Sequence, residues 1–435
     1  MRERLVTLVL CTAEDGVLGS LPSFEVATPW WQDVREVVEA ARRRFGLDVT
    51  ILRLLRAEAE TPPHGGPVTY LAQLDTPPRL RGRHAPASMV SAPAVLPLLT
   101  PWPGDPLAPH PLRAPYAQPG GPQADLAWAQ AALTAAGLAP TGPARQIRTW
   151  NLSSIWRIPT TVGPAWLKAV PPFLAHEGPL LALLQRMGPG SGRGAHPVVP
   201  AVIAADPGRV LLANVPGTDQ YGAHGVVTAD LLHLLIDLQV ACLPPLADLA
   251  VVGVPDVRAQ HLPARAEHLL AQVSAELDTA DRDRAERLVS RLPTRLTAIA
   301  ACGLPDTLVH GDFHPGNVRG RPARPGRPGQ YAVLDWADST IGQPIRDVAH
   351  YCGQLRPGDR PRAYQRAERI WQAAAPGCEP LRAAHLAEPV AALQAALAWQ
   401  SFLDSIEPDE RAYHEGDPAA GLIRASALAE AKPSE

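Results

Sequence analysis

Lysine is almost missing from this sequence. Lysine and arginine together number 40, but only Lys168 and Lys432 are lysines. Arginine supplies the rest of the positive charge, and the 49 prolines and abundant alanine suggest a bias toward GC-rich codons. In such a chain an internal lysine is not the default cationic residue, so Lys168 is a candidate for a specific role.

Cysteine and long apolar runs are also scarce. Five cysteines are scattered over 435 residues, without a Cys-x-x-Cys pair or a cysteine and histidine cluster at zinc-ligand spacing. They indicate free thiols in a reducing compartment. No run reaches the roughly 20 apolar residues of a membrane helix, and the short run Leu5–Leu10 favours a β-strand over a signal peptide. We therefore expect a cytoplasmic protein without membrane contact.

There is little excess charge of either sign. The formal net charge is −3, with 46% hydrophobic and 19% charged residues, which is typical of a globular protein. Proteins that bind nucleic acid need a basic surface to neutralise phosphates, so nucleic acid is not an expected partner. A chain of 435 residues predicts two or three domains, and its oligomeric state stays open.

Composition and periodicity divide the chain into four parts. Residues 1–100 alternate strand-like runs with one amphipathic helix, predicted over Trp31–Phe45, and indicate an α/β domain. Residues 101–123 carry a proline every two to four positions, which excludes a continuous helix or central strand and indicates a semi-rigid linker. Residues 124–215 predict a small sheet with one helix. Residues 216–435 are mostly helical, with one short strand-rich interruption.

That interruption holds the most chemically suggestive residues. It reads Val309-His310-Gly311-Asp312-Phe313-His314-Pro315-Gly316-Asn317-Val318, and the next apolar strand ends in Leu334-Asp335-Trp336. Phosphoryl transfer needs an acid that orients the attacking hydroxyl and oxygen ligands for Mg²⁺. A carboxylate, an amide five residues later and a second carboxylate after a strand supply these groups. The alternative is a turn whose carboxylates only cap neighbouring backbone.

The motif HGDFHPGN, followed by LDW, resembles that of the aminoglycoside phosphotransferase family and its relatives among choline kinases. The resemblance covers roughly residues 124–428. The resemblance implies an α+β, bilobal protein-kinase-like fold, with a β-rich N-lobe at 124–215 and a helical C-lobe at 216–435. It implies an ATP- and Mg²⁺-dependent phosphotransferase that acts on a hydroxyl group of a small molecule.

The same resemblance assigns roles within this segment. Asp312 would be the catalytic base, and Asn317 and Asp335 would be the magnesium ligands. His310 would stabilise the loop. Asp347 matches the family's later aspartate at a helix start, where it would support the catalytic loop, a role that is compatible with a simple helix cap.

A nucleotide must then bind upstream of the catalytic loop. Lys168 lies in a strand-like run, where kinase-like folds place a lysine on the α- and β-phosphates, paired with a helix glutamate. Glu177, early in the following helix, is the matching candidate. The alternative for Lys168 is an exposed edge residue.

Two further segments are candidates for nucleotide contacts. Ser153 and Ser154 lie in a turn where kinases place a phosphate-covering loop, although an ordinary polar hairpin tip fits as well. The segment Leu211–Gly217 resembles the family's interlobe hinge. The backbone around Asn214 would then bind adenine.

Residues 1–100 resemble a Nudix hydrolase domain. Gly19 to Glu25 fits the opening of that family's box, but Arg35-Glu36-Val37-Val38-Glu39-Ala40 arrives two residues late, with Ala40 in place of a glutamate. Three arginines, Arg42–Arg44, follow where that family's motif would close on its glycine, so the local charge would repel a metal ion. We therefore expect a separate, non-catalytic Nudix-like domain, with an ordinary α/β domain as the alternative.

Rival functions differ from this interpretation in specific residues. A protein kinase would have a Gly-rich GxGxxG loop, an HRD motif and an APE motif, none of which is present in the sequence. A catalytically silent kinase-like scaffold would be expected to lose Lys168, Asp312, Asn317 or Asp335, and all four are present. An active N-terminal hydrolase would make the chain bifunctional. The acceptor is not identified: acidic residues between Asp404 and Asp417 could attract a cationic substrate or form a solvated surface.

Overall fold

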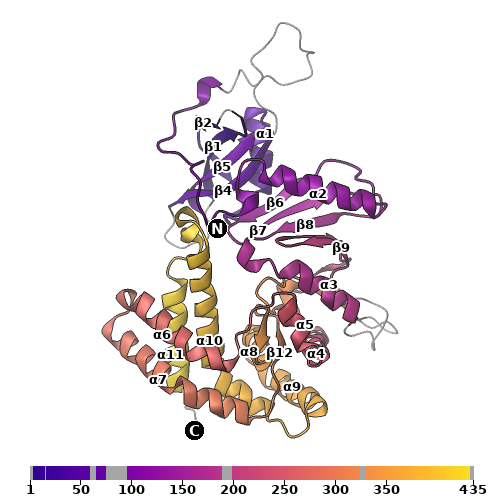
Figure 1. Ribbon diagram of the computed structural model, residues 1–435, viewed down its shortest axis with the longest axis vertical. Helices are drawn as coiled ribbons and strands as arrows, with labels where there is room; N and C mark the ends of the chain where they lie inside the picture. Colours follow the sequence, from indigo (N-terminus) through magenta and orange to yellow (C-terminus); the bar gives the residue numbers. More distant parts are fainter. Residues whose placement is uncertain are drawn as a thin grey trace. The chain divides into compact units, whose positions relative to one another are not determined.

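The computed structural model describes residues 3–14, 16–58, 65–74, 96–188, 198–323 and 329–431, and it divides into two compact units. Each unit is assembled from segments that are distant in sequence (Figure 1). Unit 1 consists of Met1–Phe173, Gly208–Leu212 and Phe402–Glu415. Unit 2 consists of Leu174–Pro207, Ala213–Ser401 and Gly416–Glu435.

The first sheet of unit 1 is mixed. Its strands are β1 (Arg4–Thr12), β2 (Gly16–Ser20), β3 (Phe24–Val26), β4 (Val49–Ala57) and β5 (Gly66–Leu74). The order is β2-β1-β5-β4, with β3 also paired to β1 and with β1 parallel to β5. Successive side chains of a strand point to opposite faces. One face therefore packs on helix α1 (Arg35–Phe45), and the other packs on Trp102 and Leu107 of the proline-rich segment.

Helix α1 starts four residues later than the predicted Trp31. The buried Arg4 guanidinium donates hydrogen bonds to the carbonyl oxygens of Trp31 (3.2 Å) and Asp33 (2.7 Å), and the Trp31 indole donates to Gly65 O. These contacts hold the chain in a non-helical path up to Val34. The helix ends at Gly46, whose φ of +67° suits a residue without a Cβ.

The second sheet belongs to the same unit. Its strands within this unit follow the order β6 (Arg145–Trp150), β7 (Ser153–Ile158), β8 (Ala165–Ala169) and β10 (Arg209–Ala213). Helix α2 (Gly121–Ala135) accompanies them. Strand β6 is bonded to the first sheet, because the Gln146 amide donates to Ile51 O (2.7 Å) and accepts from Ile51 N (2.9 Å). Thr149 N also donates to Gln32 O. The N-terminal residues and this sheet therefore form one body.

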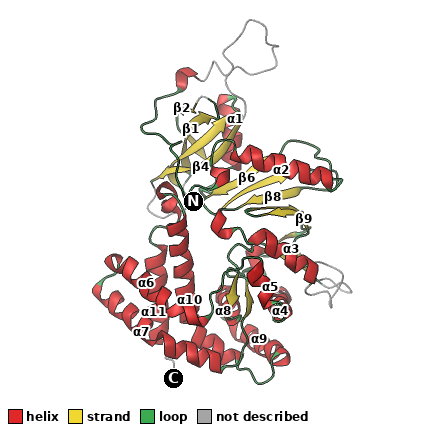
Figure 2. Cartoon of the chain, viewed as in Figure 1, coloured by secondary structure: helices red, strands yellow, loops and turns green. Residues whose placement is uncertain are grey.

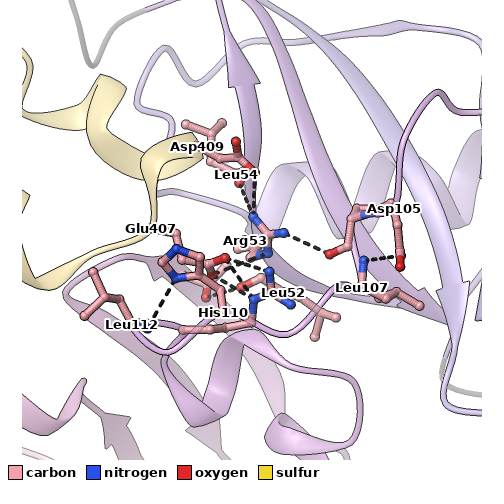
Figure 3. A network of polar contacts seen from close by, with 12 residues as sticks. Leu52, Arg53, Leu54, Asp105, Leu107, His110, Leu112, Glu407 and Asp409 are labelled. Carbon is pink, nitrogen blue, oxygen red and sulfur yellow. Dashed lines mark hydrogen bonds and ion pairs between the residues drawn. The ribbon is translucent and has the colours of Figure 1, made fainter.

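The segment Phe402–Glu415 completes unit 1 through buried charges (Figure 3). Glu407, only 3% exposed, accepts from the Arg113 guanidinium at 2.6 Å and lies 3.7 Å from that of Arg53. Arg53 also donates to Asp409 at 3.1 Å and to Pro106 O at 2.9 Å. Burial raises the pKa of neighbouring Glu410 to about 8. Glu407 and Asp409 thus bind arginines of this chain, which argues against a role for them in attracting a cationic substrate.

Unit 2 is mainly helical, with two small sheets, β11-β13-β14 and β12-β15 (Figure 2). Its strands are β9 (Val202–Asp206), β11 (Thr218–Asp219), β12 (Thr307–Val309), β13 (Val318–Arg321), β14 (Gln330–Val333) and β15 (Thr340–Gly342). Its helices are α3 (Glu177–Met187), α4 (Val226–Ala241), α5 (Leu246–Val251), α6 (Leu262–Val273), α7 (Thr279–Ala301), α8 (Ile345–Gln354), α9 (Arg360–Ala374), α10 (Pro380–Ser405, whose last residues belong to unit 1) and α11 (Asp417–Ala431). Helix α4 packs against β12 and α8, and α6 packs against α7.

All five cysteines are free and buried. Within the described part of the chain, no helix combines the length and the apolar character needed to cross a membrane.

Candidate active site

The predicted catalytic loop lies in unit 2, between β12 and β13. Gly311 has a φ of +90°, and a Cβ at this position would lie 2.2 Å from the carbonyl oxygen of Asp338. Only glycine fits both this backbone conformation and this close approach. Residues Pro315–Asn317 then form one 3₁₀ turn, which the Nδ1 atom of His314 caps by accepting from Gly316 N at 3.0 Å.

Asp347 holds this loop from helix α8. Its fully buried carboxylate accepts hydrogen bonds from the backbone N–H groups of His310 (2.7 Å) and Gly311 (3.0 Å). The Gln239 amide donates a third, at 3.2 Å. A buried carboxylate is stable when donors surround it, so Asp347 positions the backbone immediately before Asp312.

His310 links the loop to the strand that leads to Asp335. Its Nδ1 accepts from Asp312 N (3.3 Å), and its Nε2 lies 2.9 Å from Leu334 O. The second contact requires a proton on Nε2, which fixes the neutral tautomer. Burial lowers the pKa of His310, against the opposing charges of Asp347, Asp312 and Asp335. His310 therefore acts as a neutral connector between two site segments.

Asp312 lies between two histidines, and its side chain remains 43% exposed. His314 Nε2 is 3.5 Å from one carboxylate oxygen, and His350 Nε2 on α8 is 3.4 Å from the other. Burial on its own would raise the pKa of Asp312, but the two histidines hold it well below its ordinary value. His350 belongs to none of the motifs in the sequence, but it follows Asp347 by three residues on one helix, a spacing that places both side chains on one face.

Asn317 is next to Asp312. Its amide nitrogen donates to the backbone oxygen (3.0 Å) and to a carboxylate oxygen (3.1 Å) of Asp312. The amide orientation thus directs nitrogen toward the carboxylate. Among the described residues the amide oxygen, the atom that a metal would bind, has no hydrogen bond.

Asp335 has an unusual backbone. Its φ of +62° is the only positive value at a residue other than glycine in the described ranges. The neighbours enforce this conformation, since Leu334 N donates to Asn317 O (2.7 Å) and Trp336 N donates to a Glu177 carboxylate oxygen (3.0 Å). Left-handed backbone at such a residue concentrates at functional sites. The exposed Asp335 side chain is therefore placed by bonds on both sides of it.

The residues predicted to contact the nucleotide are distributed over both units. Glu177, 1% exposed, lies in unit 2 and is bonded to the residue after Asp335. Lys168 is half-buried on β8 in unit 1, opposite Ile155. Its pairing with Glu177 stays a prediction.

Ser153, Ser154 and Asn214 also have defined places. Both serines are buried at the start of β7 and accept hydrogen bonds from tryptophan indoles, of Trp150 (3.0 Å) and Trp156 (3.1 Å) respectively. These contacts give the hydroxyls a structural role in unit 1. Asn214 follows β10 and lies in unit 2.

The site has the arrangement of a kinase catalytic loop. Its carboxylate is that of Asp312, the amide five residues later is that of Asn317, and the second carboxylate, after a strand, is that of Asp335. The fold of unit 2 and this site define a phosphotransferase of the kinase-like class.

The model of the phosphotransferase enzyme family matches residues 154–384, more than half of the chain. This chain belongs to the phosphotransferase enzyme family, and it is an enzyme of the small-molecule kinase class, whose acceptors are hydroxyl groups. A search of the curated proteins gives no significant match. The family match begins at residue 154, and the predicted Nudix resemblance of residues 1–100 is not shown.

Several solved structures resemble this chain at low sequence identity. A phosphotransferase of the aminoglycoside type in complex with GDP and kanamycin is 14% identical, with a TM-score of 0.50, over 70% of this chain and 99% of that one. A macrolide 2'-phosphotransferase from Brachybacterium faecium is 19% identical, with a TM-score of 0.45, over 66% and 95%. A choline/ethanolamine kinase family protein from Mesorhizobium loti is 17% identical, with a TM-score of 0.46, over 71% and 95%.

Proposed function

We propose that this enzyme transfers the γ-phosphate of ATP to a hydroxyl group of a small molecule, with Asp312 as the base. The observation that carries the proposal is the loop in which Asp347 and His310 hold Asp312 beside Asn317. The same loop is hydrogen-bonded to Leu334, the residue before Asp335. A bond forms between the acceptor oxygen and the γ-phosphorus, the bond to the bridging oxygen of ADP breaks, and the hydroxyl proton passes to Asp312.

The environment of Asp312 defines what it can do. Because the two histidines keep its pKa low, the carboxylate is ionised at neutral pH and accepts a hydrogen bond from the acceptor hydroxyl. Phosphoryl transfer has a loose transition state in most analyses, so orientation of the nucleophile matters more than early proton removal. Asp312 thus orients the hydroxyl first and takes the proton late.

The donor set fits magnesium. Asn317 and Asp335 offer an amide oxygen and a carboxylate, and Mg²⁺ usually takes one or two protein ligands while it keeps waters and phosphate oxygens. Within the described ranges, no group of three or more histidine, cysteine, aspartate or glutamate side chains could hold a metal ion. When bound, Mg²⁺ would neutralise charge on the β- and γ-phosphates.

The direct test is a coupled assay for ADP release. The full-length protein is incubated with ATP, Mg²⁺ and a panel of hydroxylated small molecules. Acceptor-dependent ADP release that requires Mg²⁺ is expected. Absence of ADP release with every acceptor, in a protein that still binds ATP, would leave a silent nucleotide-binding protein as the better description.

Lys168 provides a separate test of the nucleotide side. Lys168→Arg keeps the positive charge but replaces a compact ammonium by a planar fork, which misplaces the phosphates. We expect a large loss of kcat/KM for ATP in both Lys168→Arg and Lys168→Ala. Arg145→Ala, at an exposed position on β6, is the control. Wild-type kinetics in both Lys168 variants would reduce this residue to an ordinary strand position.

We also propose that the N-terminal residues do not hydrolyse nucleoside diphosphates. Glu36 accepts from Thr28 N at 3.0 Å, and Glu39 pairs with Arg43 on the same helix. Ala40, which stands where the Nudix box has a further glutamate, is buried in the core. The two glutamates thus have partners of their own, and the local arginines repel a cation.

This proposal is tested on the full-length chain, because its N-terminal residues share one unit with β6 and Phe402–Glu415. Hydrolysis of nucleotide sugars and dinucleotides is measured with Mg²⁺ or Mn²⁺, in the wild type and in Glu39→Gln. No turnover above background is expected in either protein. Turnover that disappears in Glu39→Gln would make the protein bifunctional.

A further inference from the structure

Tyr221 is a large exposed side chain that lies against the catalytic loop. The residue is 73% exposed and follows shortly after the end of β11, in unit 2. A Cβ added at Gly316 would lie only 2.3 Å from the Cζ atom of the Tyr221 ring. The ring therefore covers part of the 3₁₀ turn Pro315–Asn317. One part of the ring contacts this turn, and the rest is open to solvent.

The backbone at Tyr221 is held to the same loop. The preceding residue, Gln220, is buried, and its backbone N–H donates to Pro315 O at 3.0 Å. The Gln220 side-chain amide donates to Thr218 O (2.8 Å) and to Gly320 O (3.3 Å). Thr218 and Gly320 are also paired across β11 and β13. The strand that follows the catalytic loop thus fixes where the Tyr221 ring begins.

The ring leads to Asp312 through His314. The centroids of the Tyr221 and His314 rings are 5.8 Å apart, with their planes tilted by 38°. His314 Nδ1 accepts from Gly316 N at 3.0 Å and so carries no proton, which places the ring proton on Nε2. Nε2 lies 3.5 Å from a carboxylate oxygen of Asp312. An exposed aromatic ring, an imidazole and the reacting carboxylate therefore lie in one row.

Exposure alone does not make an aromatic side chain functional, because single apolar residues are common on protein surfaces. Tyr221 differs in its surroundings. It is the most exposed tyrosine, tryptophan or phenylalanine in the part of the chain that the structure describes, and it contacts the loop that carries Asp312. Small-molecule sites are typically lined by apolar and aromatic side chains beside a few polar groups that fix orientation. The row from Tyr221 to Asp312 has this composition.

We propose that Tyr221 binds the acceptor: the flat, apolar face of a ring in the acceptor packs on the Tyr221 ring and brings a hydroxyl group that this ring carries to Asp312. The inference rests on the proposed function and adds the residue that selects the acceptor. Aromatic side chains pack well on flat apolar faces, and an open-chain alcohol has no such face. Alicyclic and aromatic rings share this chemistry, and the experiment separates them.

The acceptor experiment uses pairs of alcohols that differ in the ring. ADP release by the full-length protein is measured with cyclohexanediol against hexanediol and with myo-inositol against sorbitol, which are the alicyclic pairs. Phenylethanediol against octanediol is the aromatic pair. Within each pair the number of carbon atoms is the same. We expect a lower acceptor KM for the ring-bearing member of at least one pair.

Variants of Tyr221 then test the residue itself. In Tyr221→Ala the KM for the ring-bearing acceptor should rise about 10-fold, while the KM for ATP stays the same. Tyr221→Phe keeps the ring and should restore the wild-type KM, which a role of the hydroxyl group would not allow. Val251→Ala is the control, since Val251 on α5 is 85% exposed and belongs to the same unit.

Two outcomes would overturn the inference while the phosphotransferase function stands. The first is ADP release with an acceptor KM that is equal in the wild type and in Tyr221→Ala. The second is a rise in the KM for ATP alone, which would assign the Tyr221 ring to the nucleotide.

A binding measurement keeps the two proposals separable if no acceptor is turned over. Saturation-transfer NMR is recorded for cyclohexanediol, myo-inositol and phenylethanediol with the full-length protein, ADP and Mg²⁺. We expect a signal from the ring protons in the wild type and in Tyr221→Phe, and its loss in Tyr221→Ala. Binding of this kind without ADP release would contradict the transfer reaction but keep the acceptor site. No signal from any probe, or equal signals in Tyr221→Ala, would contradict the inference.

Discussion

Asp312→Asn should lower kcat by about 10² to 10⁴, the usual cost of losing a general base, while ATP binding stays close to that of the wild type. The amide keeps the size of the side chain and can still contact Asn317, so the loop should keep its shape. It cannot accept the hydroxyl proton, and it loses the negative charge that His314 and His350 face. The measurement is the steady-state rate of ADP release with an identified acceptor, together with calorimetric binding of ATP.

His350→Gln is the informative companion to this variant. Glutamine can still donate to the carboxylate oxygen, so only a modest change in kcat is expected. Near-normal turnover in Asp312→Asn would falsify its assignment as the base. A parallel loss of ATP binding would instead indicate that the substitution had disrupted the metal site around Asn317.

Glu407→Ala should destabilise unit 1 by about 3 to 5 kcal/mol, the typical cost of breaking a buried ion pair by removing one partner. Two arginines depend on this carboxylate: Arg113 at 2.6 Å and Arg53 at 3.7 Å, both with side chains at most 7% exposed. Asp409 would be the remaining carboxylate beside Arg53. For a unit of this size the melting temperature should fall by about 6 to 20 °C.

Glu415→Ala is the matched control, since Glu415 lies in the same segment but is exposed. It should change the melting temperature by less than about 2 °C, in keeping with surface substitutions. Thermal unfolding by circular dichroism provides the comparison. Equal melting curves for the two variants would mean that Glu407 is solvated in solution and that the network in Figure 3 contributes little.

The sequence predicted the local features well. The motif from His310 to Asn317 predicted that Asp312 and Asn317 lie together, because a short loop leaves few alternatives, and their side chains are hydrogen-bonded. The catalytic roles of these residues and of Asp335 stay predictions. The run Leu5–Leu10, predicted as a strand, lies within β1 (Arg4–Thr12). The start of α1 was wrong because Arg4 takes carbonyl groups that a helix would have used, and periodicity contains no information on such a contact.

Contacts between distant residues could not be predicted. Asp409 is 356 residues from Arg53, and nothing in the local charge pattern distinguishes a buried partner from a solvated acid. The same applies to Gln239, which donates to Asp347 from 108 residues away. His350 could have been found from its spacing to Asp347, but a histidine within a helix is common, and the sequence does not reveal that it faces Asp312.

The discontinuity of unit 1 has a consequence for synthesis. Arg113 leaves the ribosome 294 residues before Glu407, which at about 5 to 20 residues per second corresponds to roughly 15 to 60 s. During that time two arginines that end up buried lack their carboxylate, and the Trp31 and Trp150 rings lack the Tyr413 ring that later packs on both. The nascent chain therefore carries an incomplete core for most of its translation, a period in which chaperone binding would protect it.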